Sequence, residues 1–380
     1  MAQIPEKGAA VRSFARLVGL LVALAALAAS GGVAAAESRL EVVARGLDNP
    51  RGLDVGRWGT VYVTEAGKGG SGPCIEGPEG PVCLGATGAV TQIAGGKQRR
   101  ILTGLPSLAA ADGSGASGPQ DIALRRYGGG ASLAVGGIAA PQRAQLGAGG
   151  AGLSTLYRVS PDLRLRVVAD LAAYEAAANP DGDQPSSDLE SNPNSVLSAK
   201  QGDYVVDAGG NDLLRVGPKG RVSLVAVFPF RFVDAPPFLG LPADTKVPLQ
   251  PVPTSVAAGP DGALYVGQLT GFPFPVGAAN VYRVKPGSAP EVYASGFTNI
   301  TDIAFGPDGS LYVLEFAKGG ILAGPPAGAL TRVRPDGARE TIVSEGLVGP
   351  TGLAIGRKGA IHISNNGSAA GIGEVVRVRR

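Results

Sequence analysis

Segment 296–347 decides the fold, and it reads GFTNITDIAFGPDGSLYVLEFAKGG (296–320) and then GALTRVRPDGARETIVSEGL (328–347). Four short runs in it are rich in residues that favour a pleated, buried surface. Pro and Gly occupy the two tight connections, at 306–309 and 334–337, where their backbone preferences suit a chain reversal. The segment therefore predicts a four-stranded antiparallel meander.

The meander recurs along the chain at a period of roughly 45–50 residues, which is typical of propeller blades. The second run of each unit appears as VYV (61–63), LAV (133–135), YVV (204–206), LYV (264–266), LYV (311–313) and IHI (361–363). One such sheet alone is marginally stable, so the copies must stack on one another. The sequence thus predicts an all-β, six-bladed β-propeller of four-stranded antiparallel blades.

The last unit ends after its third run, and the missing outer strand is available near the start of the chain. LEVVARGL (40–47) has the shape of ETIVSEGL (340–347), the fourth run of unit five. We therefore expect the first strand of the mature chain to complete the last blade and close the ring.

The N-terminus has the features of a secretory signal peptide. Lys7, Arg12 and Arg16 precede an apolar stretch at 17–29, which is too short to span a bilayer comfortably, and Ala36 ends a small-residue cleavage site. An uncleaved anchor is the alternative. The prediction is a signal peptide at 1–36, a single propeller domain at 37–380, and a secreted or periplasmic protein with no membrane span after cleavage.

Charge and chain organisation limit the classes of partner. Lys and Arg exceed Asp and Glu by 34 − 31 = +3, and the signal region carries +2 of this excess. A nearly neutral mature chain argues against a nucleic-acid partner, which usually needs a basic stripe. We expect a monomer.

Two cysteines, Cys74 and Cys83, lie close together in unit one. In an exported chain such an isolated pair usually forms a disulfide. A metal site is the alternative, but two thiols without further Cys or His ligands do not fill a zinc site. We expect a disulfide that holds this loop in one shape.

Connections of two lengths alternate along the chain. Those between strands one and two and between three and four are short, whereas the others are long and lie together on the opposite face of a propeller: 65–88, 105–119, 136–154, 171–193, 228–253, 268–279 and 315–329. Long loops on one side of a rigid scaffold usually carry binding. Drift at tolerant sites is the alternative, but it should scatter insertions over both faces.

These loops are aromatic, and one of them predicts a helix capped by Asp170. Phenylalanine side chains there suit an apolar wall for a ligand or partner, or packing of the loops onto the blades. Acidic residues start two of the first strands near the same mouth. The candidate ligand-binding residues are Phe230, Phe232, Phe272, Phe274, Asp121 and Asp302.

Polar side chains end several second strands at the long-loop side. Oxygen ligands that converge there could hold Ca²⁺, which takes six to eight oxygens. Alternatively, the same side chains bond to free backbone groups where the loops depart. The candidate metal ligands are Glu65, Asp207, Glu315 and Asn365.

Histidine-based catalysis has little support. The chain contains one histidine, His362, which takes the place of a repeat tyrosine in the other units. A Ser-His-Asp or Cys-His arrangement would have to use it. No catalytic residue is assigned.

Several segments resemble the ScyD/ScyE family, whose members are exported and take their name from an association with biosynthesis of the pigment scytonemin. They include GLDNPRGL (46–53), VADLAAYEAAANPDG (168–182), VVDAGGNDLLRV (205–216) and ISNNGSAAGIGEVVRV (363–378), and the resemblance covers essentially the whole mature chain. It implies a six-bladed TolB-like or NHL-type propeller. It carries no agreed activity and no catalytic residues.

Two functions remain open from the sequence. One is an exported binding module whose long-loop face holds an apolar small molecule or a protein partner. The other is a calcium-dependent, lactonase-like hydrolase, because the wider propeller class includes such enzymes.

Overall fold

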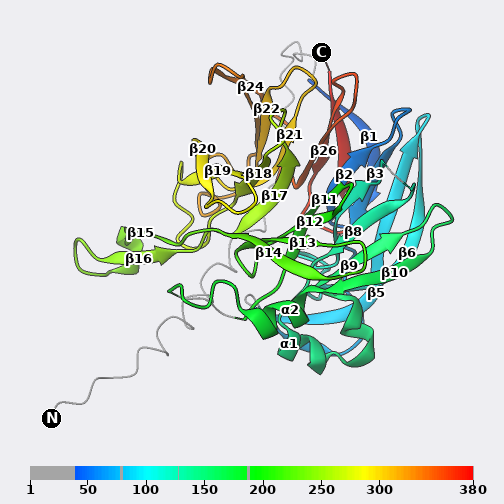
Figure 1. The fold of residues 1–380 in the computed structure, drawn as a ribbon, viewed down its shortest axis with the longest axis horizontal. Helices are drawn as coiled ribbons and strands as arrows, with labels where there is room; N and C mark the ends of the chain where they lie inside the picture. Colours follow the sequence, from blue (N-terminus) through cyan, green and yellow to red (C-terminus); the bar gives the residue numbers. More distant parts are fainter. Residues whose placement is uncertain (1–38, 78–79, 127, 186–188, 380) are drawn as a thin grey trace, which may run out of the picture.

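A computed structural model describes residues 39–77, 80–126, 128–185 and 189–379. Six antiparallel sheets are arranged as the blades of a propeller (Figure 1). This confirms the six-bladed, four-stranded architecture predicted from the repeats. The predicted signal peptide and its cleavage site at Ala36 lie outside the described residues.

The last blade joins the two ends of the described chain, as predicted. Its strands lie in the order β1 (Leu40–Leu47), β27 (Gly373–Val378), β26 (Ile361–Asn365) and β25 (Gly352–Ile355). Leu40 pairs with Val378 and Leu47 with Gly373. The ring is therefore closed by backbone hydrogen bonds between segments more than 300 residues apart.

The other blades follow one another along the chain, and we number them 1 to 5, with the closing blade as blade 6. Their strands, from the axis outward, are β2 (Pro50–Val55), β3 (Val61–Glu65), β5 (Gly80–Ala94) and β6 (Lys97–Ala109); β7 (Pro119–Leu124), β8 (Ala131–Val135), β9 (Thr155–Val159) and β10 (Leu165–Asp170); β11 (Pro193–Ala199), β12 (Gly202–Asp207), β13 (Asp212–Val216) and β14 (Val222–Val227); β17 (Pro253–Ala258), β18 (Leu264–Gln268), β19 (Ala279–Val284) and β20 (Glu291–Phe297); and β21 (Ile300–Phe305), β22 (Leu311–Glu315), β23 (Ala329–Val333) and β24 (Arg339–Val343).

The core lies between blades rather than in one central mass. Between blades 6 and 1, for example, Leu53 and Val63 pack with Ala354 and Val375, all at most 7% exposed. The strands supply these contacts because alternate β-branched and aliphatic side chains face the neighbouring sheet. Each blade is thus stabilised by the two beside it, as expected for stacked repeats.

Hydrogen bonds between neighbouring inner strands run round the axis. Threonine hydroxyls at the start of three inner strands donate to backbone carbonyls of the next blade: Thr254 to Ile300 (2.8 Å), Thr301 to Pro350 (3.0 Å) and Thr351 to Pro50 (2.6 Å). The last of these crosses from blade 6 to blade 1. These bonds fix the inner strands relative to one another at the end where the long loops enter.

The long-loop face carries most of the additional elements. They are α1 (Ala140–Gln145), η2 (Gly147–Gly152), α2 (Leu171–Ala178), η3 (Pro237–Leu239) and a hairpin of β15 (Arg231–Asp234) and β16 (Lys246–Leu249). Asp170 caps α2 by accepting a hydrogen bond from the Ala173 amide at 3.0 Å, which confirms the predicted helix start. The hairpin extends away from the ring at the left of Figure 1 and was expected to be loop.

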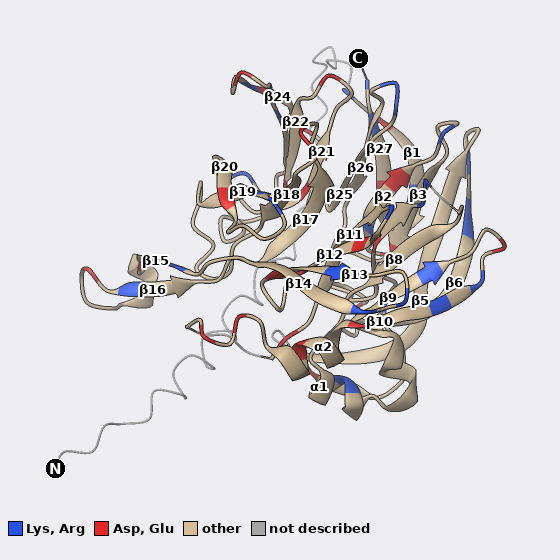
Figure 2. Ribbon diagram, viewed as in Figure 1, with Lys and Arg blue, Asp and Glu red and all other residues tan. Residues whose placement is uncertain are grey.

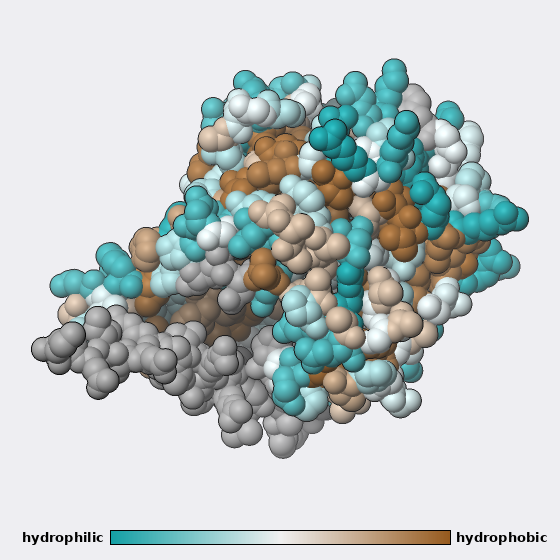
Figure 3. All heavy atoms as spheres, turned by 60° about the horizontal axis from the view of Figure 1, so that its bottom comes forward, coloured by the Kyte–Doolittle hydropathy of each residue, from teal (hydrophilic) through white to brown (hydrophobic). Residues whose placement is uncertain are grey.

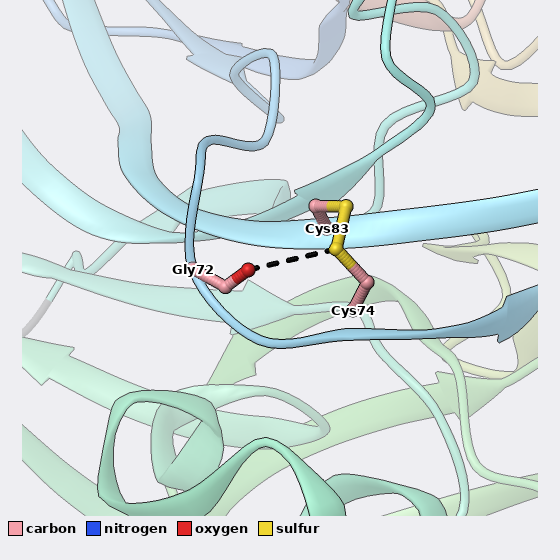
Figure 4. The surroundings of a disulfide bond; sticks show 3 residues. All are labelled: Gly72, Cys74 and Cys83. Atoms are coloured by element: carbon pink, nitrogen blue, oxygen red, sulfur yellow. Dashed lines mark hydrogen bonds between the residues drawn. A yellow bond between two sulfur atoms is a disulfide. The ribbon is translucent and has the colours of Figure 1, made fainter.

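The first insertion of blade 1 is also more regular than expected. Part of the stretch 65–88 forms β4 (Cys74–Gly77), which pairs with an extension of β5. Cys74 and Cys83 lie opposite each other on these strands and form the predicted disulfide, with Cα atoms 4.0 Å apart (Figure 4). The disulfide holds the insertion as a two-stranded ribbon.

No helix in the described part of the chain combines the length and apolar character needed to cross a bilayer.

Candidate functional site

A cavity of about 160 Å³ lies on the propeller axis, where the inner strands begin. Its wall is polar because five of the inner strands contribute a charged or hydrogen-bonding side chain near their first residue. Three apolar side chains from the long loops stand over it. The lining includes Arg51, Gln120, Asp121, Asn194, Thr254, Thr301, Asp302 and Thr351, with Leu269, Phe316 and Ile321 from the loops.

Asp121 and Asp302, both predicted as ligand-binding residues, line this cavity, and both also join neighbouring blades. Asp121 Oδ2 accepts hydrogen bonds from Ser195 Oγ and the Val196 amide, each at 2.9 Å. Asp302 Oδ2 accepts one from the Leu353 amide at 2.6 Å. The two carboxyl groups therefore hold the wall of the cavity together.

Burial changes the charge of these groups. It raises the pKa of Asp121 to about 6. It raises the pKa of Asp302 well above its usual value, and the nearby Asp121 charge adds to the effect. At neutral pH Asp302 thus retains its proton, so the cavity contains less negative charge than its composition suggests.

Arg51 is the cationic group of the cavity, and sequence reasoning did not select it as a site residue. Its Nη2 donates to the Ala116 carbonyl at 2.7 Å, and its buried Nε has no hydrogen-bond partner among the described residues. None of the ion pairs in the described part of the chain includes it. Burial lowers its pKa to about 10, so the guanidinium is still charged at neutral pH.

The four predicted metal residues end the second strands of four different blades. Each bonds to the backbone just before the inner strand of its own blade. The acceptor oxygens and donor amides are Glu65 Oε2 with Asp48 (2.8 Å), Asp207 Oδ1 with Asn192 (2.6 Å), Glu315 Oε1 with Thr298 (2.8 Å) and Asn365 Oδ1 with Val348 (2.7 Å).

The structure does not bring these four side chains together. Among the described residues, no three His, Cys, Asp or Glu side chains form a group that could hold a metal ion. Their shared position is explained by one structural role, in which the side chain braces the loop that enters the inner strand.

The predicted aromatic residues are partly brought together. The rings of Phe272 and Phe274 lie 6.2 Å apart, and Phe238 of η3 packs edge-on against Phe272 at 6.2 Å. Phe272 is 45% and Phe238 62% exposed. Phe232 is also exposed, on β15, while the Phe230 amide bonds to Gln184 Oε1 at 2.7 Å. Figure 3, which brings the lower side of Figure 1 forward, shows apolar patches interrupted by hydrophilic residues.

A group of buried carboxyls in blade 3 was not predicted. Glu175 on α2 lies near Asp181, Asp207 and Asp212, and all four side chains are at most 2% exposed. Burial and the neighbouring Asp207 and Asp181 raise the pKa of Glu175 to about 8. The signal was an acidic residue four positions after Leu171, on the apolar face of the predicted helix.

His362 lies on β26 and pairs with Arg377 of β27, in the register position that Tyr312 occupies against Arg332 in blade 5. Burial lowers its pKa to about 4, so the ring is neutral at physiological pH. It lies outside the lining of the axial cavity.

A second hollow, of about 550 Å³, lies between the β5–β6 ribbon and η2. It is larger but wide open, and it is lined mainly by small and apolar residues such as Leu84, Gly149 and Val167. No charged side chain is part of its lining. The axial cavity is therefore the better candidate for specific recognition.

Comparison with known proteins shows the fold and no more. No family model matches the chain, and no curated protein is similar to it. A Bacteroides thetaiotaomicron protein of unknown function is 11% identical with a TM-score of 0.53, over 89% of this chain and 75% of that one. A Thermus thermophilus protein named as an oxidoreductase (glucose dehydrogenase) is 17% identical with a TM-score of 0.50, over 89% and 98%. A streptogramin B lyase is 13% identical with a TM-score of 0.49, over 89% and 96%. The chain is thus a six-bladed propeller in fold.

Proposed function

We propose that the protein binds a small amphipathic molecule on its long-loop face, with an acidic group in the axial cavity and an apolar part against the loops above it. The observation that carries this proposal is Arg51, a buried guanidinium that faces the cavity without a counter-charge among the described residues. Burying an unpaired charge is costly, and a carboxylate or similar anion would offset that cost.

The size of the cavity limits what it can hold. Pockets for whole small ligands usually measure about 300–1,000 Å³, whereas this one measures about 160 Å³. It therefore accommodates the head of a ligand better than the whole. Leu269, Phe316 and Ile321 provide an apolar exit, and the exposed Phe272 and Phe238 offer further apolar surface on the same face.

A binding role agrees better with this geometry than a calcium-dependent hydrolase does. The hydrolase would require a metal centre, and the residues predicted to form it are engaged in bracing loops. A protein partner on the aromatic surface is the other occupant that the sequence left open. The axial cavity favours a small molecule, because a protein side chain would have to enter between the loops to reach Arg51.

The test is calorimetric titration with a series of straight-chain monocarboxylates, from acetate to decanoate, and with methyl decanoate as the uncharged control. We expect affinity to increase with chain length, methyl decanoate to bind much more weakly, and Arg51→Gln to remove the difference between acid and ester. Thr60→Ser on the opposite face serves as the control variant. Absence of binding across the series, or equal affinity for acid and ester, would overturn the proposal.

Membership of the ScyD/ScyE family is likewise a proposal, supported by the segments quoted from 46–53, 168–182, 205–216 and 363–378. We also propose export with cleavage after Ala36, and a monomeric mature protein. Intact-mass measurement of the protein recovered from the producing cells tests the cleavage site. Light scattering tests the oligomeric state.

A further inference from the structure

The side of the propeller opposite the axial cavity carries the one tryptophan of the chain in an unusual setting. Trp58 is 91% exposed, at the tip of the turn between β2 and β3. The guanidinium of Arg57 lies over its ring, 5.9 Å from the ring centroid. A large aromatic side chain in full contact with water gains nothing for the fold, so its position calls for another reason.

The turns on either side of Trp58 are basic. The equivalent turn of blade 6 contains Arg357 and Lys358, and that of blade 2 contains Arg126, all exposed. No ion pair within the described residues includes Arg57, Arg126 or Arg357, and the three turns, 56–60, 125–130 and 356–360, contain no Asp or Glu. We call Arg57, Trp58, Arg126, Arg357 and Lys358 the basic rim.

The three turns lie side by side. A Cβ on Gly56 would lie 3.7 Å from Leu124 at the end of β7, and a Cβ on Gly356 would lie 3.3 Å from Val55 at the end of β2. Turns 56–60 and 356–360 have the same length and the same closing hydrogen bond, from the first amide to the fifth carbonyl, at 2.8 Å. The rim is therefore level, unlike the long-loop face with its helices and hairpin.

The rest of this side differs in charge. The equivalent turns of blades 4 and 5 contain Asp261 and Asp308, and both pair with arginines of their own blade, Arg283 and Arg332. Net positive charge is thus concentrated on blades 6, 1 and 2. Figure 2 shows Lys and Arg along the loops at the upper right, where these blades lie.

We propose that the basic rim docks the propeller onto an anionic lipid bilayer, with Trp58 entering the headgroup region. Tryptophan prefers the membrane interface because its ring is apolar and its indole N–H is polar. Basic residues held close to an anionic membrane each contribute about fivefold in binding, equivalent to about 1 kcal/mol. A level surface lets the three turns reach the bilayer together, and it directs the axial cavity away from the membrane.

Trp58 itself makes the test direct, because all tryptophan fluorescence comes from it. The full chain is mixed with phosphatidylcholine vesicles, with or without phosphatidylglycerol, at about 0.1 M salt. We expect co-sedimentation and a blue shift of the emission with the anionic vesicles only, and loss of both at high salt. Binding to the anionic vesicles without a blue shift would overturn the proposal, as would equal binding to neutral ones.

Matched variants locate the surface. Arg57→Glu with Arg357→Glu removes two positive charges from the rim and should weaken vesicle binding at least about 25-fold. Lys219→Glu with Lys285→Glu makes the same change in net charge at exposed outer turns of blades 3 and 4 and should have much less effect. Trp58→Ser should reduce binding several-fold without changing the melting temperature. Equal loss in the two double variants would show a general charge effect and refute the basic rim.

Discussion

The two sides of the ring use charged residues in opposite ways. On the long-loop side, acidic groups are buried and bonded to backbone amides; Glu65, for example, is 0% exposed. On the short-turn side, acidic groups such as Asp261 lie at exposed turns and pair with arginine. The same four-stranded repeat produces both sides, so the difference comes from the connections and not from the strands.

This difference teaches how to interpret a repeated polar residue. Glu65, Asp207, Glu315 and Asn365 recur at one register position, and the sequence suggested that they recur to bind a metal. The structure shows that each braces the loop of its own blade. A long loop leaves backbone amides without strand partners, and a buried acceptor at the adjacent strand end satisfies one of them.

The largest effect should come from removing one brace. Glu65 also accepts hydrogen bonds from Thr91 and from Arg100, at 2.6 and 2.9 Å. Glu65→Ala leaves these donors and the Asp48 amide without their acceptor, so we expect the free energy of unfolding to fall by roughly 3 kcal/mol in urea denaturation.

Asp261→Ala is the matched change on the other side. It removes a carboxylate that pairs with an arginine at the surface, where water and salt screen the interaction. It should hardly change the unfolding midpoint. Similar losses in the two variants would contradict the contrast drawn between the sides.

The pH dependence of stability should show a smaller effect of the same burial. The pKa of Glu175 is raised to about 8 from an ordinary value of 4.5, so between these pH values the folded state holds a proton that the unfolded state has released. Stability should therefore be greatest below about 4.5 as far as this group is concerned, and it should decline as the pH rises through 8. Thermal unfolding followed across this range measures the effect.

Glu175→Gln is the control for that profile, because it keeps the shape and removes the titration. We expect a flatter pH profile for the variant and higher stability than the parent at alkaline pH. If the variant shows the same decline as the parent, another group must cause it.

Calcium should have the smallest effect. The predicted ligands do not come together, and the described residues contain no ready group of metal ligands. Addition of millimolar calcium or of a chelator should leave the melting temperature unchanged. A clear rise with calcium would revive the hydrolase hypothesis, and the carboxyl group around Glu175 and Asp212 would then be the first place to look.

The sequence was sufficient for the framework because the repeat carries its own evidence. The six units, the closure by 40–47 and the concentration of long connections on one side all follow from strand patterns and turn residues. The β15–β16 hairpin was missed because segment 228–253 is rich in proline and lacks clear alternation. Its strands pair only with each other, away from the blades.

The axial site was harder to predict, for a physical reason. Asp121 and Asp302 could be placed near the mouth from the starts of their strands. The importance of Arg51 could not, because it depends on what lies around the guanidinium, and the cavity wall comes from five inner strands spread over 300 residues. The buried position of Glu175 was visible in the helix pattern, but its acidic neighbours come from the loop at 181 and from β12 and β13.

The most direct test of the account is a crystal structure of the protein with decanoate. We predict that its carboxylate lies within hydrogen-bonding distance of the Arg51 guanidinium and that its chain leaves between Phe316 and Ile321. Decanoate bound only elsewhere, or an axial cavity that stays free of it at saturating concentration, would contradict the claim that this cavity is the binding site.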